Sequence, residues 1–453
     1  MSLLIVGMDI TIVNVALPSI RADLHASVSG LQWTIDAYTV VLASLLILSG
    51  STADRLGRRR TFQVGLVLFT LGSLLCSIAP GLGWLIAFRM LQAVGGSMLN
   101  PVAMSIITNV FTDPSERARA IGVFGGVVGV SLGVGPVVGG ILIDSIGWRS
   151  IFWINVPIGI AAFVLAAIFV PESKAERARR VDPVGQSLVI VVLLSLTYAI
   201  IEAPRAGDSP EIWALAVLCV AALVALLLHE SRRVDPLIEL TFFRSIPFSG
   251  ATATAVCAFG AFSAFLFLNT LYLQDVRGLS ALRAGLFLLP MATMIAVFAP
   301  ISGRMVGNRG PRAPLLMAGA AMFIGALPLT ALTDGLGYGW LLACYLVFGL
   351  GFGMVNAPIT NAAVSGMPRS QAGVAAAVAS TSRQVGASLG IAVVGAVVSS
   401  GAGVSIRTEF SRASHAGWWI VVGYGAAVFL LALTTTGRWA ASSASKVAYL
   451  LDE

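Results

Sequence analysis

The chain has 453 residues, of which 57% are hydrophobic and only 11% are charged, and its formal net charge is +7. About a quarter of the residues in a typical soluble protein are charged, so this composition excludes a water-soluble protein of this length. Apolar segments of about 20 residues, the length that crosses a bilayer core, recur along the whole chain. They indicate an all-α integral membrane protein rather than a transmembrane barrel, whose segments are short and alternating.

We expect fourteen transmembrane helices. In chain order the expected spans are 2–20, 31–52, 61–79, 83–109, 118–143, 150–170, 184–203, 211–228, 247–274, 283–306, 313–333, 338–364, 373–400 and 416–436. An even number of spans places both termini on one side of the membrane. Loops and tail on that side hold 19 of the Lys and Arg residues and the opposite loops hold 7. The positive-inside rule therefore predicts a multi-pass protein of the cytoplasmic membrane with both termini in the cytoplasm. Because topology accounts for the basic loops, no nucleic-acid partner is expected.

The two halves of the sequence resemble each other. The stretch "GGSMLNP" at residues 95–101 matches "GFGMVNAP" at 351–358, and the loop at 50–60 has a degraded copy at 303–312. Internal repeats of this kind are common in secondary transporters, where the site lies near the membrane midplane between the repeats. The repeats predict two six-helix bundles at 1–170 and 247–436, two inserted helices with their loops at 171–246, and a cytoplasmic tail at 437–453.

Carboxylates lie inside the first two expected helices, at Asp9 and Asp36. A charge within the membrane is costly and usually marks a pathway for protons, ions or substrate. Burial and a neighbouring cation act on such a carboxylate in opposite directions, so it can exchange protons near neutral pH. We predict that Asp9 and Asp36 couple transport to protons and that Asp36 also meets the substrate. The alternative for Asp9 is a static ion pair with Arg89 that holds helices together.

The loop "GSTADRLGRRRT" joins the second and third helices on the inner side. Gly50 and Gly57 permit tight turns, and we expect Asp54 to cap a helix end. A simple positive-inside anchor would explain the arginines, but it does not explain the spacing G-x-x-x-D-R-x-G-R-R. The candidate residues of this signature are Gly50, Asp54, Arg55, Gly57, Arg58 and Arg59.

Arg89 lies within the fourth expected helix, where an arginine costs about 2.5–3.5 kcal/mol on insertion scales. The alternative to a role in the proton pathway is a side chain that reaches the outer interface. Arg383 lies within the thirteenth helix, in "STSRQVGASLG", and either bonds to backbone carbonyls or takes part in gating. Tyr38, Met98 and Met354 are candidates for a substrate pocket, because aromatic faces attract cations.

The fifth expected helix is rich in glycine, which lets neighbouring helix backbones approach closely, and it contains a proline that bends it. Its candidate residues are Gly129, Gly133, Gly135, Pro136, Gly139 and Gly140. The stretch "GWRSIFWINVP" follows directly at residues 147–157.

These motifs together resemble the major facilitator superfamily over nearly the whole chain. The inner loop resembles the signature loop of the superfamily. The G-P-x-x-G-G run and the W-R-x-x-F-x-x-N-x-P run after it resemble the antiporter motif of drug:proton antiporters. The runs D-x-T-x-V-N-V-A-L-P and W-x-x-D-x-Y, with "STSRQVGASLG", resemble the fourteen-helix antiporters of the quaternary-ammonium efflux type. The stretch "RMLQAVGGSMLNP", which begins at Arg89, resembles the arginine motif of the fourth helix in this family, except at Ala93, where the family has glycine.

The resemblance implies a proton-coupled exporter of lipophilic small molecules, with cations as the first expectation, that works by alternating access as a monomer in the bilayer. In that family Arg89 would assist proton transfer and Asp36 would recognise organic cations. Asp54 and Arg58 would latch the two halves on the inner side, and the glycine face would seal the site. Members that handle divalent cations carry extra acidic residues in helix 10 or 13. Here neither helix carries any, so monovalent cations, zwitterions and neutral drugs are open.

Two alternatives to a multidrug exporter are an exporter dedicated to one metabolite, such as a self-made antibiotic, and a membrane sensor that transports nothing. We expect no enzyme, because no His or Cys cluster and no nucleophile–base pair falls within the spans. The sequence has no phosphate-binding loop that ends in lysine, and no cofactor or metal is expected.

Overall fold

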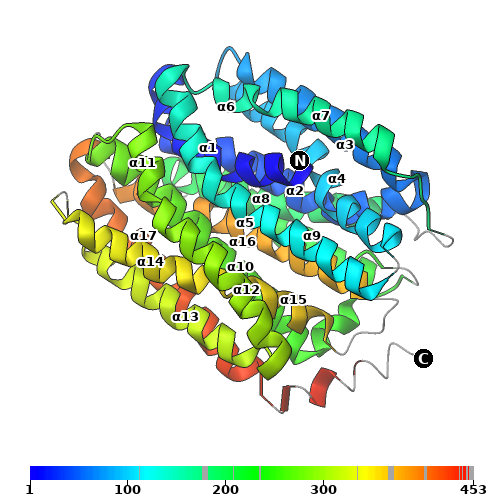
Figure 1. The fold of residues 1–453 in the computed structure, drawn as a ribbon. Coiled ribbons are helices and arrows are strands. Elements are labelled where there is room, and N and C mark those ends of the chain that lie inside the picture. Colours follow the sequence, from blue (N-terminus) through cyan, green and yellow to red (C-terminus); the bar gives the residue numbers. More distant parts are fainter. Residues whose placement is uncertain are drawn as a thin grey trace. The chain divides into compact units, whose positions relative to one another are not determined.

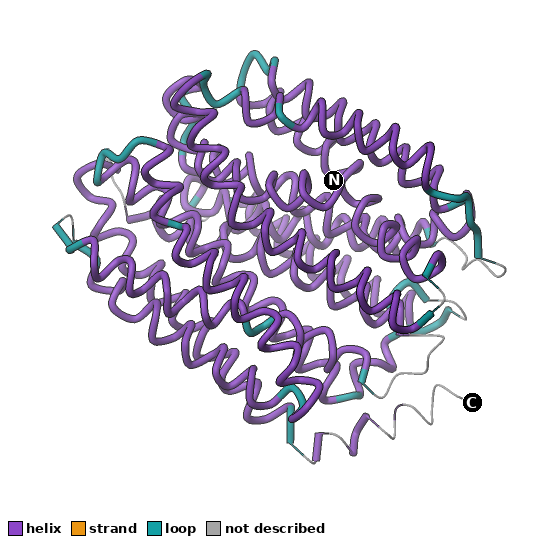
Figure 2. The backbone as a smooth tube through the Cα atoms, in the orientation of Figure 1, coloured by secondary structure: helices purple, strands orange, loops and turns teal. Residues whose placement is uncertain are grey.

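Every regular element that the structure describes is helical. The computed structural model describes residues 1–111, 113–175, 182–207, 209–233, 236–333, 335–365, 372–401, 406–437, 439–440, 442–444 and 447. Among these residues the ribbon contains helices and connecting loops (Figure 2). In lipid every backbone polar group must be paired within the chain, and a helix meets this demand segment by segment. The all-α prediction is confirmed.

Helices α1 to α8 follow one another in the first part of the chain. Their bounds are α1 Ser2–Leu24, α2 Val28–Leu56, α3 Arg58–Ser77, α4 Leu82–Val110, α5 Pro114–Ser145, α6 Ser150–Trp153, α7 Asn155–Phe169 and α8 Pro183–Ala206. The remaining elements are α9 Pro210–Glu230, η1 Leu240–Arg244, α10 Ile246–Leu271, η2 Tyr272–Val276, α11 Ala281–Phe287, α12 Leu289–Arg309, α13 Arg312–Ala326, η3 Leu327–Ala331, α14 Tyr338–Gly353, α15 Asn356–Val364, α16 Ala372–Gly401 and α17 Ile406–Thr435.

Thirteen helices among the described residues are long and apolar enough to cross a membrane. The expected span 118–143 falls on α5, whose described apolar part is the shorter segment Val130–Ser145. The last expected span was placed at 416–436, but α17 begins at Ile406. That start was wrong because the added turns carry polar residues, and helical hydrogen bonds continue beyond the apolar segment.

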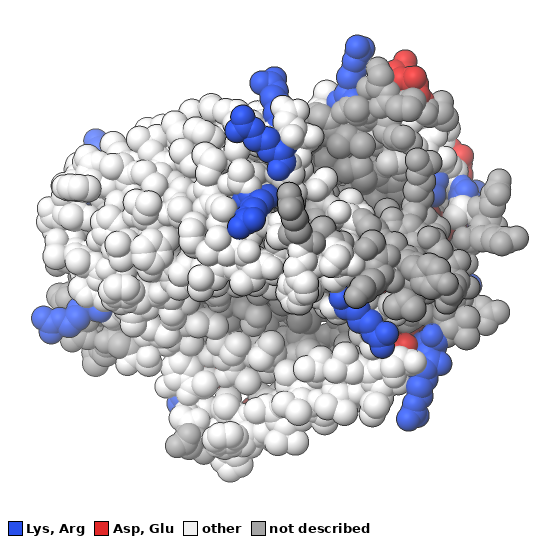
Figure 3. Space-filling view, turned by 90° about the horizontal axis from the view of Figure 1, so that it is seen from below, with Lys and Arg blue, Asp and Glu red and all other residues white. Residues whose placement is uncertain are grey.

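The surface is largely uncharged, as expected for a chain solvated by lipid. In the most apolar segment of α9 only 17% of the residues are buried, and large side chains such as Trp213 and Val217 are exposed. Figure 3 shows a face on which uncharged side chains predominate and charged ones stand in a few separate places. Such a surface would be unfavourable in water and is suited to a bilayer.

The chain divides into two compact units. Unit 1 comprises Met1–Leu194 with Leu279–Leu286, and unit 2 comprises Ser195–Gly278 with Phe287–Glu453. In unit 1 α3 lies against α4 and α7, and in unit 2 α13 lies against α14 and α17 (Figure 1). The domain limits expected from the sequence repeats remain predictions.

Glycine allows a close helix crossing between α3 and α4 in unit 1. A Cβ on Gly95 of α4 would lie 2.2 Å from the backbone nitrogen of Phe69 and 2.6 Å from the carbonyl oxygen of Gly65, both on α3. Two helix backbones can meet at such a distance only where no side chain stands between them. This crossing fixes α4, and therefore Arg89, against α3.

We expect Gly95→Ala to reduce the free energy of unfolding by about 1–3 kcal/mol, because the added methyl group would force α3 and α4 apart. The measurement is the thermal denaturation of the purified protein in detergent. Gly83→Ala is the matched control, since it lies on the same helix and a Cβ there meets nothing within 4 Å. Equal melting temperatures for the two variants would contradict this account of the crossing.

Candidate functional site

A buried ion pair joins α1 to α4 inside unit 1. The Nη1 atom of Arg89 donates to Oδ2 of Asp9 at 2.6 Å, and the two side chains are 1% and 0% exposed. The same Nη1 donates to Oε1 of Gln92 at 2.8 Å, and the Gln92 amide donates to the other Asp9 oxygen at 2.9 Å. Arg89, Asp9 and Gln92 thus form a closed triangle of hydrogen bonds, in which both carboxylate oxygens are used.

Neutral polar side chains extend this triangle to α3, α6 and α7. The Gln92 amide also donates to the Ser73 hydroxyl at 3.3 Å, and the Asn155 amide donates to that hydroxyl at 2.9 Å. The Ser73 hydroxyl in turn donates to the carbonyl of Phe152 at 3.1 Å. Ser73, Gln92 and Asn155 are all buried, so each would be costly without these partners.

Helix α2 supplies the remaining contacts of Arg89. Its Nε donates to the carbonyl oxygen of Thr34 at 3.2 Å, and its guanidinium carbon lies 4.2 Å from the centre of the Tyr38 ring. The cation is therefore held by a carboxylate, an amide, a carbonyl and an aromatic face. The expectation that Arg89 alternatively reaches the outer interface is wrong, because the side chain is enclosed and points to Asp9.

Asp36 is fully buried on α2. It lies two residues before Tyr38, whose ring packs on Arg89, so helical geometry directs the Asp36 and Tyr38 side chains to opposite sides of α2. The structure thus brings Asp9 and Arg89 into direct contact, and the role of Asp36 remains a prediction.

The three candidate pocket residues lie in different surroundings. Tyr38 packs on Arg89 and is buried, and Met98 lies next to Gly65, whose Cβ would stand 2.7 Å from the Met98 Cβ. Met354 is fully buried at the break between α14 and α15, where the Ser302 hydroxyl donates to its carbonyl at 2.8 Å. Their roles in substrate binding remain predictions.

The loop between α2 and α3 is organised by a residue that the sequence did not single out. The Glu172 carboxylate accepts from the backbone N–H groups of Arg59 at 3.1 Å and Arg60 at 3.3 Å, in the first turn of α3. It therefore provides the cap that we expected from Asp54. Asp54 instead accepts from the Arg58 side chain at 3.0 Å, four residues along the chain.

Gly57 is required at the turn between α2 and α3. Its φ of 113° is rarely adopted by other residues, and a Cβ would lie 2.6 Å from the Glu172 carboxylate. Gly50 has nothing within 4 Å of its Cβ position, and Arg55 stands exposed in the last turn of α2. Close packing therefore accounts for Gly57 and not for Gly50.

The glycine face of α5 lies against α1 and the start of α11. A Cβ on Gly135 would lie 2.1 Å from the Thr11 hydroxyl, and a Cβ on Gly139 would lie 2.5 Å from the Ile12 side chain. A Cβ on Gly140 would lie 2.4 Å from the Leu282 Cα atom. On α11, a Cβ on Gly285 would lie close to the Pro136 carbonyl oxygen of α5. The Asp144 carboxylate of α5 accepts hydrogen bonds from the first backbone N–H groups of α11. Gly133 lies on α5 as well, and the surroundings of Gly129 fall outside the described residues.

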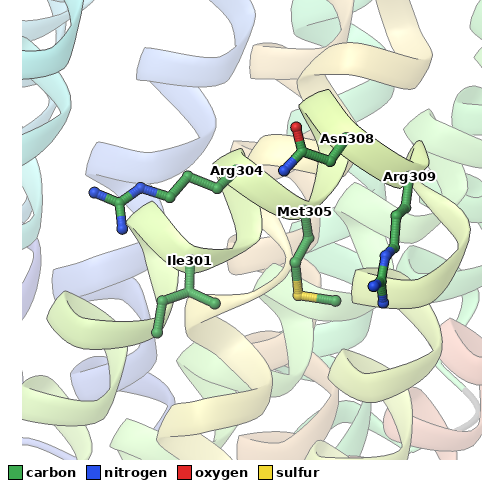
Figure 4. Close-up of a pocket in the computed structure, with 5 residues that line it drawn as sticks. All are labelled: Ile301, Arg304, Met305, Asn308 and Arg309. Carbon is green, nitrogen blue, oxygen red and sulfur yellow. The ribbon is translucent and has the colours of Figure 1, made fainter.

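Arg383 of α16 donates from Nη2 to the Thr360 hydroxyl of α15 at 2.6 Å. This side-chain contact differs from the expected bond to backbone carbonyls. A separate hollow of about 310 Å³ lies beside α12 and is lined by Ile301, Arg304, Met305, Asn308 and Arg309. Figure 4 shows that Arg304 extends away from Arg309 there, and none of the predicted site residues is among the lining residues.

Known proteins resemble this chain over most of its length. A family model described as the Major Facilitator Superfamily matches residues 1–391. Multidrug resistance protein Stp of Mycobacterium tuberculosis is 35% identical over 418 residues, which cover 91% of this chain and 77% of that protein. A tetracenomycin C resistance and export protein of Streptomyces glaucescens is 36% identical over 414 residues, with 91% and 77% covered. A puromycin resistance protein of Streptomyces alboniger is 35% identical over 440 residues, with 94% and 87% covered.

Solved structures support the fold. An auto-inhibited peptide transporter of the POT family superposes with a TM-score of 0.68 at 16% identity, covering 95% of this chain and 94% of that one. A bacterial homologue of the human lysosomal transporter Spinster superposes with a TM-score of 0.64 at 18% identity, covering 99% and 95%. At these identities the likeness concerns the fold alone.

We expect Arg89→Met to reduce the free energy of unfolding by about 3–5 kcal/mol, because it leaves the Asp9 carboxylate buried without its cation. The double variant Asp9→Leu with Arg89→Met should recover part of this loss, since it buries no unpaired charge. Thermal denaturation in detergent measures both variants. A double variant that is less stable than Arg89→Met alone would contradict the view that the unpaired charge causes the loss.

Proposed function

Because this chain belongs to the Major Facilitator Superfamily, we propose that it is a proton-coupled antiporter that exports lipophilic drugs or antibiotics across the cytoplasmic membrane. It is a multi-span membrane transporter and not an enzyme. The observation that carries the proposal is the buried pair of Asp9 and Arg89, a titratable carboxylate held against a cation inside the membrane. The names of the three relatives, which refer to drug resistance and to export, support the direction and the substrate class.

Proton exchange at Asp9 would act on the contact between α1 and α4. When Asp9 is ionised, it holds Arg89 through a short charge-assisted hydrogen bond. A proton on Asp9 removes one charge of the pair, while Arg89 keeps its bonds to Gln92 and Thr34. The attraction between α1 and α4 then weakens. In an alternating-access cycle this difference would favour one conformation in each protonation state.

Other parts of the proposal rest on the sequence motifs. In the inward-open state an ionised Asp9 or Asp36 would accompany substrate uptake, and a proton from outside would displace the substrate. Asp36 would recognise a positively charged group. Asp54 and Arg58 would latch the inner side, and the glycine face of α5 would seal the site. We propose a monomer with both termini in the cytoplasm, in line with the distribution of basic residues.

An exporter dedicated to one compound is the second candidate. Two of the relatives reported above are named for a single antibiotic, tetracenomycin C or puromycin. The same proton site at Asp9 would serve either function. A substrate panel separates the two candidates.

We expect substrate addition to drive proton movement in proteoliposomes that contain the wild-type protein. Asp9→Asn should abolish this movement, because the neutral asparagine side chain does not bind and release a proton at physiological pH. The measurement follows an entrapped pH-sensitive dye under an imposed pH gradient as lipophilic substrates of different charge are added. Asp23→Asn is the matched control on the same helix, since Asp23 pairs with Arg149 in a half-exposed position.

Proton movement that persists in Asp9→Asn at the wild-type rate would remove Asp9 from the proton pathway. A wild-type protein that moves no protons with any substrate of the panel would contradict antiport itself.

A further inference from the structure

Arg383 is a cation within the membrane-spanning part of unit 2 that has no acidic partner among the described residues. Its Nη2 atom bonds only to the neutral Thr360 hydroxyl, and its Nε atom is buried without a hydrogen-bond partner. Arg89 in unit 1 is almost fully buried and faces a carboxylate at 2.6 Å, whereas the Arg383 side chain is half-buried. An arginine that lies in a low-dielectric environment without a carboxylate partner has N–H groups that can donate to an anion.

Most of the surrounding helices cannot supply that anion. The sequences of α10, α12, α13, α14, α15 and α16 contain no Asp or Glu, and α17 contains one acidic residue, Glu409, in its first turn. A positive charge in such a bundle creates a potential that disfavours a second cation and favours a negative group. Guanidinium also matches the geometry of carboxylates better than an ammonium does, because its N–H groups form a planar fork.

An aromatic ring lies near the guanidinium and belongs to a cluster of three. The ring centre of Phe259 on α10 is 5.9 Å from the Arg383 guanidinium carbon. Phe259 also packs edge-on against Phe352 of α14 at 5.2 Å, and Phe262 stacks on that ring at 4.0 Å. Phe352 immediately precedes the break between α14 and α15, and broken helices commonly form transporter substrate sites. A flat aromatic molecule with a negative group matches this combination of a ring face and a fixed cation.

We propose that Arg383, Thr360 and Phe259 form an anion-recognition subsite that accepts the ionised carboxylate or phenolate of an aromatic substrate. The proposal rests on the export function proposed above and defines the charge of its substrate. It replaces the cation expected from the sequence by an anion, or by a zwitterion whose positive group lies elsewhere. Arg383 would donate from Nε and Nη to the substrate oxygens, and Phe259 would contact the ring.

Three probes with the same ring and different charge test this subsite: 1-pyrenebutyrate, its neutral amide, and 1-pyrenemethylammonium. Binding to the purified full chain in detergent is measured by pyrene fluorescence, and export is measured in proteoliposomes. Arg383→Gln should weaken binding of 1-pyrenebutyrate by about tenfold to a hundredfold, the usual effect of losing hydrogen bonds to a charged group. Binding of the amide should stay within about twofold of wild type, and Arg383→Lys should restore part of the affinity for the carboxylate.

Thr360→Val is a second variant that keeps the cation and removes its one hydroxyl contact. It should retain the preference for 1-pyrenebutyrate over 1-pyrenemethylammonium. Loss of all three probes to the same extent in Arg383→Gln would overturn the subsite and assign Arg383 to gating. A wild-type protein that exports the amide or the cation but not the carboxylate would overturn the anion proposal while export stands. A wild-type protein that exports none of a wider drug panel would overturn both proposals.

Discussion

The buried charge pair of Asp9 and Arg89 is the interaction on which the arrangement of unit 1 depends. Within a bilayer neither charge is stable alone, so each must find its partner as the helices assemble. The pair fixes α1 against α4, and its neighbours Gln92, Ser73 and Asn155 carry the constraint to α3 and α7. Close crossings at glycine, such as Gly95 against α3, let the helices approach far enough for these short bonds to form. A single proton on Asp9 changes the charge balance of the whole network.

The two units differ in the partners of their internal arginines. In unit 1 Arg89 is satisfied by an acidic partner and by neutral groups, so its charge is balanced inside the protein. In unit 2 Arg383 has a hydroxyl and an aromatic face as its partners among the described residues. This contrast suggests that unit 1 binds and releases the proton and that unit 2 recognises a charged group of the substrate. Antiport requires such separate sites or competition between proton and substrate at one site.

The sequence predicted the charges inside apolar segments, whose burial costs free energy, and the motifs, which are defined by the spacing of their residues. A carboxylate and an arginine inside apolar segments are rare enough to be noticed individually, and their pairing follows from the energy of burial. Ser73 was missed, because neutral polar residues occur in many helices and carry no such signal. Asn155 was noted only as part of the W-R-x-x-F-x-x-N-x-P run, without a partner or a role of its own. The Glu172 cap was missed because it joins positions 113 residues apart in the chain. The helix breaks at Leu288 and at Met354–Val355 arise from Pro290 and from packing around Ser302, which an apolar profile does not register.

The most direct test of the account is the protonation state of Asp9 itself. Infrared difference spectra of the reconstituted protein between pH 5 and pH 9 would detect the C=O stretch of a protonated carboxylic acid, and Asp9→Asn would identify the contribution of Asp9. The account predicts a protonated Asp9 band that changes amplitude when substrate is added. A spectrum in which Asp9 stays ionised over the whole range, with and without substrate, would contradict a role in proton transfer and leave a purely structural ion pair.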